Sequence, residues 1–129
     1  MRKGPSHFGR NMFNKKSAAR AERRQQRMDA GLVATQFPEV ASIAISMVYS
    51  QRGIKQPMPR TVNFFPSSYA FFTIECLSKE CVEGGFNFTQ ILTGMIGNHK
   101  ESSKGQLGCV GGPSTDHSAI VYEVAIQYV

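Results

Sequence analysis

Residues Tyr69–Cys81 read Tyr-Ala-Phe-Phe-Thr-Ile-Glu-Cys-Leu-Ser-Lys-Glu-Cys, so a predicted strand leads directly into two thiols. Tyr69–Leu77 is rich in aromatic and β-branched side chains, which is typical of a β-strand. Alternate side chains of a strand point to opposite faces. One face therefore carries Ala70, Phe72, Ile74 and Cys76, and the other carries Tyr69, Phe71, Thr73, Glu75 and Leu77. We expect the first face to be buried and this segment to be the central strand.

Two longer segments show the same period of two. In Val40–Ser50 the alternate residues Ala41, Ile43, Ile45, Met47 and Tyr49 are apolar, and most of those between them are small or polar. Ala119–Val129 repeats this pattern with Ile120, Tyr122, Val124, Ile126 and Tyr128. Such alternation predicts strands with one face in a core. Thr61–Phe65 is expected to be an edge strand or an extended connector, and Gln106–Val110 a short strand.

One amphipathic helix is predicted between these strands. Its apolar residues recur at helical spacing: Phe88, Ile91, Leu92, Met95 and Ile96. Asn87 and Gln90 have the spacing of a capping box, and Gly97 or Asn98 is placed to end the helix. Long one-faced strands and one amphipathic helix predict an α+β fold. We expect an antiparallel sheet of about four strands with one helix packed on one face.

Charge divides the chain into a basic N-terminal arm and a nearly neutral remainder. Residues 1–29 contain nine Lys or Arg and two acids, whereas the remainder contains six basic and seven acidic residues. We therefore expect residues 1–34 to form a flexible arm, with a helix over 17–29 that Gly31 ends, and residues 35–129 to form a single α+β domain. The arm predicts an anionic partner, most commonly nucleic acid. The candidate contacts are Arg10, Lys15, Lys16, Arg20, Arg23, Arg24 and Arg27. The other interpretation is a solvated tail helix without a partner.

The three cysteines predict a metal site. Structural zinc takes four tetrahedral Cys or His ligands. Cys76, Cys81 and Cys109 supply three, and His117 is the expected fourth, with His99 as the alternative. Two other interpretations stay open, namely buried apolar thiols and a redox or disulfide role. A catalytic Cys81 is disfavoured because the neighbouring acids Glu80 and Glu83 would raise its pKa.

These patterns favour a small non-enzymatic binding protein associated with nucleic acid or the ribosome, with RNA a better candidate than DNA, and stabilised by zinc. We expect the exposed-face aromatic residues, such as Tyr69 and Phe71, to pack against Phe64 and Phe65, and the alternative is that they stack on bases. The alternative function is a protein-interaction or assembly module whose arm binds an acidic protein surface, and a small thiol or metal enzyme is a third. Because no segment resembles a signal peptide or a membrane span, we expect a soluble cytoplasmic protein without a membrane partner.

Overall fold

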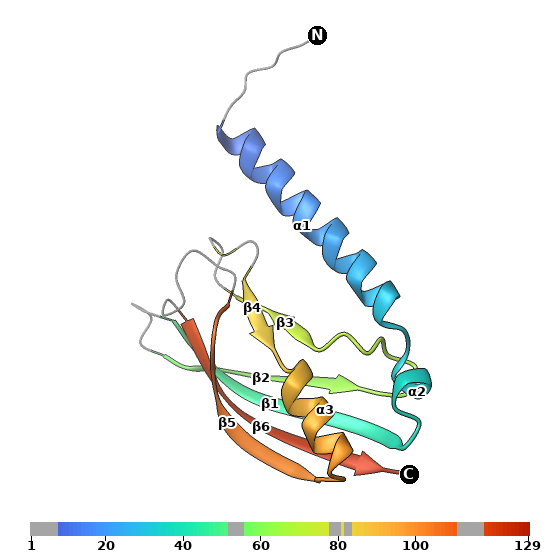
Figure 1. Ribbon diagram of the computed structural model, residues 1–129. Coiled ribbons are helices and arrows are strands. Elements are labelled where there is room, and N and C mark those ends of the chain that lie inside the picture. The colour runs from blue at the N-terminus through green and yellow to red at the C-terminus, as the bar shows by residue number, and fades with distance from the viewer. Residues whose placement is uncertain (1–7, 52–55, 78–80, 82–83, 111–117) are drawn as a thin grey trace.

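The computed structural model describes residues 8–51, 56–77, 81, 84–110 and 118–129, with the backbone alone for residues 8–16. It has an α+β fold, as predicted (Figure 1). The main sheet is antiparallel, with strand order β2-β1-β6-β5, and it consists of β1 (Val40–Gln51), β2 (Met58–Phe64), β5 (Ser102–Gly108) and β6 (Ser118–Tyr128). A second sheet pairs β3 (Thr73–Glu75) with β4 (Gly85–Asn87). The helices are α1 (Phe8–Ala30), α2 (Val33–Gln36) and α3 (Thr89–Gly97).

The two long strands predicted from alternation form the centre of the main sheet. The apolar residues of β1 lie opposite those of β6 in register, with Ile45 opposite Val124 and Met47 opposite Tyr122. These side chains are buried, because α3 and the β3–β4 sheet cover this face of the main sheet (Figure 1). Two aromatic contacts join the layers: Phe88 lies edge-on to Tyr122 with centroids 5.1 Å apart, and Phe86 lies edge-on to Tyr49 at 6.2 Å.

The two edge strands differ from their predicted bounds. β2 begins at Met58 rather than Thr61 and so includes Pro59, which an edge strand tolerates because one side of its backbone needs no ladder partner. β5 covers Ser102–Gly108, where the sequence predicted a loop followed by a strand at Gln106–Val110. An edge strand of this kind buries little side-chain surface, so its sequence lacks the apolar alternation on which the prediction relied.

The prediction of a central strand at Tyr69–Leu77 is wrong. Only Thr73–Glu75 is a strand, and it pairs with β4 outside the main sheet. The backbone before it bonds elsewhere, since Ala70 N donates to Gly31 O at 2.7 Å and Phe72 O accepts from Phe88 N at 2.9 Å. The predicted alternation of burial is nevertheless correct: Phe72, Ile74 and Cys76 are buried, whereas Tyr69, Glu75 and Leu77 are exposed. The alternation of apolar residues therefore correctly indicated an extended segment that packs on the core. It did not indicate which strand that segment pairs with.

The predicted helix is α3, and its apolar face is the predicted one. Phe88, Leu92, Met95 and Ile96 are buried and Ile91 is half-buried. The side-chain oxygen of Asn87 accepts a hydrogen bond from Thr89 N at 2.9 Å, which satisfies one of the amides left without a partner at a helix start. The helix ends at Gly97 with Asn98 as its C-cap.

The helix predicted over 17–29 lies within α1, which extends away from the main sheet (Figure 1). Gly31 follows it with φ +76°, a left-handed conformation that favours glycine after a helix. Ala19, Arg23 and Arg27 recur every four residues on the side of α1 that packs, and Ala19 is buried while the two arginines are half-buried. Among the described helices, none combines the length and the apolar character that a membrane span requires.

Candidate metal centre

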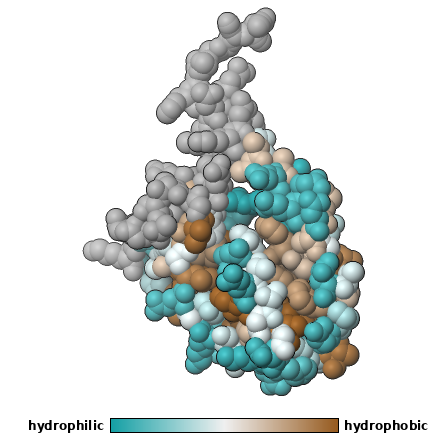
Figure 2. Space-filling model, viewed as in Figure 1, coloured by the Kyte–Doolittle hydropathy of each residue, from teal (hydrophilic) through white to brown (hydrophobic). Residues whose placement is uncertain are grey.

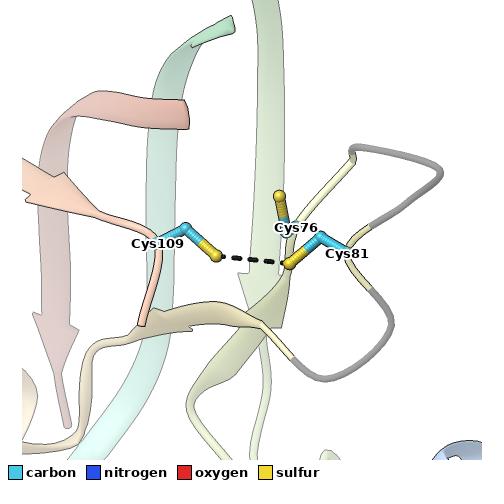
Figure 3. A group of neighbouring side chains, drawn as sticks. All are labelled: Cys76, Cys81 and Cys109. Carbon is cyan, nitrogen blue, oxygen red and sulfur yellow. Dashed lines mark hydrogen bonds between the residues drawn. The ribbon is translucent and has the colours of Figure 1, made fainter. Parts of the chain in front are cut away.

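Three buried thiols meet at one end of the main sheet. Cys76 directly follows β3, Cys81 lies between β3 and β4, and Cys109 directly follows β5. Their Sγ atoms all lie within 4.8 Å of one another. Figure 3 shows the sulfur atoms of Cys81 and Cys109 pointing toward each other, and they are 3.5 Å apart. None of the three forms a disulfide.

A bridge between the two sheets brings Cys109 to the other thiols. Val110 N donates to Gly85 O at 2.9 Å, and Gly85 N donates to Val110 O at 3.1 Å. Cys76 N donates to Gly84 O at 3.3 Å, which draws together the two ends of the segment that carries Cys81. A Cβ atom at position 85 would lie 2.7 Å from the carbonyl oxygen of Ile74, so the close approach of β3 and β4 requires glycine there.

Two hydroxyl groups surround the Cys76 sulfur. Ser118 Oγ lies 3.2 Å from Cys76 Sγ, and Tyr49 Oη lies 3.6 Å from it. Ser118 is 3% exposed and Tyr49 is 2% exposed, so both contacts are shielded from water. A hydroxyl that donates to a thiolate favours the charged sulfur, as outer hydrogen bonds do around metal ligands. Cys76 therefore has neighbours suited to a metal-bound thiolate.

The sulfur separations are close to those of a tetrahedral thiolate site. A disulfide bond is about 2.05 Å long, well below the 3.5 Å that separates Cys81 Sγ from Cys109 Sγ. Zn–S bonds of about 2.3 Å at tetrahedral angles place two sulfurs about 3.8 Å apart. The three thiols here, 4.8 Å apart at most, would need to shift by about 1 Å or less to match that separation. The three thiols could therefore hold a metal ion, and thiolates are soft ligands.

Burial keeps two of the thiols protonated when no metal is bound. It raises the pKa of Cys109 to about 12, with a further contribution from the hydrogen bond to Cys81. Burial also raises the pKa of Cys81 above its ordinary value. A protonated thiol is a poor nucleophile, so neither group is prepared for covalent catalysis. A bound metal reverses this preference, because its charge stabilises the thiolates.

The structure thus brings together the three predicted cysteine ligands and does not bring His99 to them. His99 precedes β5, whereas Cys109 follows it, and seven strand residues span about 23 Å. The His99 ring stacks on Tyr128 instead, with centroids 3.9 Å apart. His117 lies outside the described residues, as do Glu80 and Glu83. Tyr49 and Ser118 were missed, because the pairing of β1 with β6 brings the two residues near each other and only the packing of the small sheet on the main sheet places Cys76 beside them.

The predicted nucleic-acid contacts fall into three groups. Arg20 and Arg24 are exposed on α1. Arg23 and Arg27 turn toward the α+β fold: Arg23 donates to Gly84 O at 3.2 Å and pairs with Glu75 at 3.4 Å, and the Arg27 guanidinium lies 5.6 Å from the Phe71 ring centroid. The side chains of the other three, Arg10, Lys15 and Lys16, lie outside the description. Phe71 contacts Arg27 and Phe64 packs against Phe72, whereas Phe65 and Tyr69 are exposed.

The sequence matches no known protein family, and comparison with curated proteins and with solved structures gave no match. The arrangement of side chains is therefore the basis for the functional argument.

Proposed function

We propose that this is a small non-enzymatic binding protein whose fold is stabilised by a structural zinc ion and whose basic helix binds nucleic acid, RNA in preference to DNA. The observation that carries the proposal is the group of three buried thiols within 4.8 Å of one another. Three thiolates form a soft donor set, and structural zinc sites use such sets in closed, buried positions. The fourth ligand predicted from the sequence is His117.

A structural role follows from where the thiols lie. Cys76 and Cys81 belong to the segment that joins β3 to β4, and Cys109 continues β5 beyond the main sheet. One ion would therefore link the small sheet to an edge strand that buries little side-chain surface of its own. Metal binding supplies folding free energy when the unfolded chain has no preformed site.

Metal analysis of the purified protein tests the zinc proposal. We expect about one zinc ion per chain. Cys81→Ser and Cys109→Ser should each lower the zinc content, whereas His99→Ala should retain it because His99 is distant from the thiols. A well-folded wild-type protein that contains no zinc, and that takes up none when zinc is added, would refute the proposal.

The nucleic-acid part of the proposal is supported by charge. Residues 1–29 carry nine basic and two acidic side chains, and Arg20 and Arg24 project from α1 into solvent. Figure 2 shows hydrophilic side chains gathered over the described half of α1. Binding to single-stranded RNA should weaken as salt rises, with a slope of about −0.7 in log K against log salt for each phosphate contact. Affinity that is independent of salt, or unchanged in an Arg20→Gln, Arg24→Gln double variant, would contradict this part.

The second candidate is an assembly module in which two copies meet through the main sheet. Val48 and Val121 lie opposite each other on the sheet face away from α3, and they are 43% and 56% exposed. Exposed apolar side chains on one sheet face are typical of an interaction surface when they form a patch. A defined oligomer in light scattering that Val121→Lys dissociates would favour this function, and a monomer at all concentrations would exclude it.

A further inference from the structure

A cleft lies between α1, β2 and β3, and none of the three cysteines is among its lining residues. Its volume is about 260 Å³. Its walls come from all three elements and consist of Arg27 from α1, Arg60, Val62 and Phe64 from β2, and Phe71, Thr73, Ile74 and Glu75 from the β3 segment. Sites for drug-sized molecules usually occupy about 300–1,000 Å³, so this cleft suits a ligand no larger than one nucleotide.

The charge in this cleft is positive and only partly compensated. Its one acidic residue, Glu75, is already paired with Arg23 at 3.4 Å, and Arg23 is not part of the lining. Within the described part of the chain, Arg27 and Arg60 form no ion pair. Two guanidinium groups from different elements therefore line one cleft without a carboxylate partner.

The positions of Arg27 and Arg60 follow from their neighbours in the structure. The Arg27 guanidinium lies over the Phe71 ring, 5.6 Å from its centroid, and such a cation–π contact restricts the side chain. Arg60 lies opposite Met47 in the β1–β2 ladder, on the same side of the sheet as the apolar core. Planar guanidinium groups bind phosphate through paired hydrogen bonds, and two of them give the charge that a phosphate requires.

We propose that this cleft binds a phosphate group of a nucleotide through Arg27 and Arg60, with Phe71 and Val62 contacting the sugar or base. The phosphate can belong to an RNA strand or to a free nucleotide. The RNA source rests on the function proposed above and gives it a defined site, with Arg60 as a contact that lies outside the basic arm. The free nucleotide does not depend on that function.

The test compares Arg60→Gln with the matched control Arg20→Gln. Arg20 is an exposed arginine of α1 that does not line the cleft, so the two changes remove the same charge at different places. The probes are a fluorescein-labelled single-stranded RNA, followed by anisotropy, and adenosine monophosphate, followed by calorimetry. We expect Arg60→Gln to weaken RNA binding about tenfold, as loss of a charge-assisted hydrogen bond does, and to weaken adenosine monophosphate binding by a similar factor. Arg20→Gln should leave binding of adenosine monophosphate unchanged.

The outcomes separate this inference from the proposed function. If RNA does not bind but adenosine monophosphate binds in a manner that depends on Arg60, the cleft is a free-nucleotide site and the nucleic-acid function is wrong. If RNA binds and neither RNA binding nor adenosine monophosphate binding changes in Arg60→Gln, the arm binds RNA and the cleft proposal is wrong. Absence of binding for both probes overturns both proposals. Arg60→Gln with unchanged thermal unfolding, which is expected for an exposed side chain, excludes misfolding as the cause of any loss.

Discussion

Zinc affinity should rise steeply between pH 6 and pH 8 because binding releases protons from buried thiols. Burial holds the pKa of Cys109 at about 12 and raises that of Cys81, so both are protonated throughout this range when the site holds no metal. Both must lose their protons to coordinate zinc as thiolates. Each released proton changes the affinity tenfold per pH unit, so these two thiols give about 100-fold per pH unit. This corresponds to about 3 kcal/mol of added stability per pH unit at saturating zinc.

The zinc-free protein should behave differently over the same range. A raised thiol pKa means that the folded state favours the protonated form, so these two groups contribute stability that is fully present below their ordinary pKa. That stability is lost only as the pH rises from about 9 toward about 12. With zinc removed, the contribution of these thiols to the free energy of unfolding should therefore be constant from pH 6 to pH 8.

Competition with a chromogenic chelator of known pH dependence measures the affinity, and urea unfolding with and without zinc measures the stability. Cys109→Ser is the matched control, because it removes one releasable proton and one ligand together and should reduce both the affinity and its dependence on pH. An affinity that does not change with pH, or a zinc-bound protein no more stable than the zinc-free one, would refute the reasoning. The thiols would then be buried apolar groups.

Three further predictions concern individual residues. Gly85→Ala places a methyl group 2.7 Å from a backbone oxygen of β3 and should cost about 1–3 kcal/mol in urea unfolding, whereas Gly94→Ala, with nothing within 4 Å, should stabilise α3 by up to about 1 kcal/mol. If Gly85→Ala and Gly94→Ala changed the free energy of unfolding equally, β3 would be able to move away from the added methyl group at little cost. Arg23→Gln removes the ion pair and the carbonyl contact that hold α1 to the segment around the thiols, so trypsin should cleave α1 faster, by roughly the fivefold expected for loss of about 1 kcal/mol. Unchanged cleavage would mean that these contacts do not hold the helix. His117→Ala should lower zinc affinity at least about tenfold while His99→Ala leaves it unchanged, and a larger loss from the second variant would contradict the ligand assignment.

The secondary-structure elements whose apolar residues recur with a regular period could be predicted from the sequence. β1, β6 and α3 each bury one complete face, so their apolar residues recur at the period of the element, and their predicted faces are correct. Edge strand β5 has no such signal, whereas the segment around β3 has the alternation but not the pairing that was predicted from it. For β5 the cause is that few of its side chains reach the core, and for β3 it is that neighbouring backbone groups bond to Gly31 and Phe88 instead of to a strand.

The candidate metal site likewise has features that the sequence predicted and features that only the tertiary structure shows. Residue type and spacing determined that Cys76, Cys81 and Cys109 were potential ligands of one ion, and that the positive charge lies in the arm, because thiol chemistry and net charge are properties of the chain itself. Only the tertiary structure decided that Cys109 reaches the other two, through the bridge between Gly85 and Val110, and that His99 is held at the opposite end of β5. Backbone pairing between distant segments sets the positions of Cys109 and His99. The pattern of apolar residues in one segment does not reveal which distant segment it pairs with.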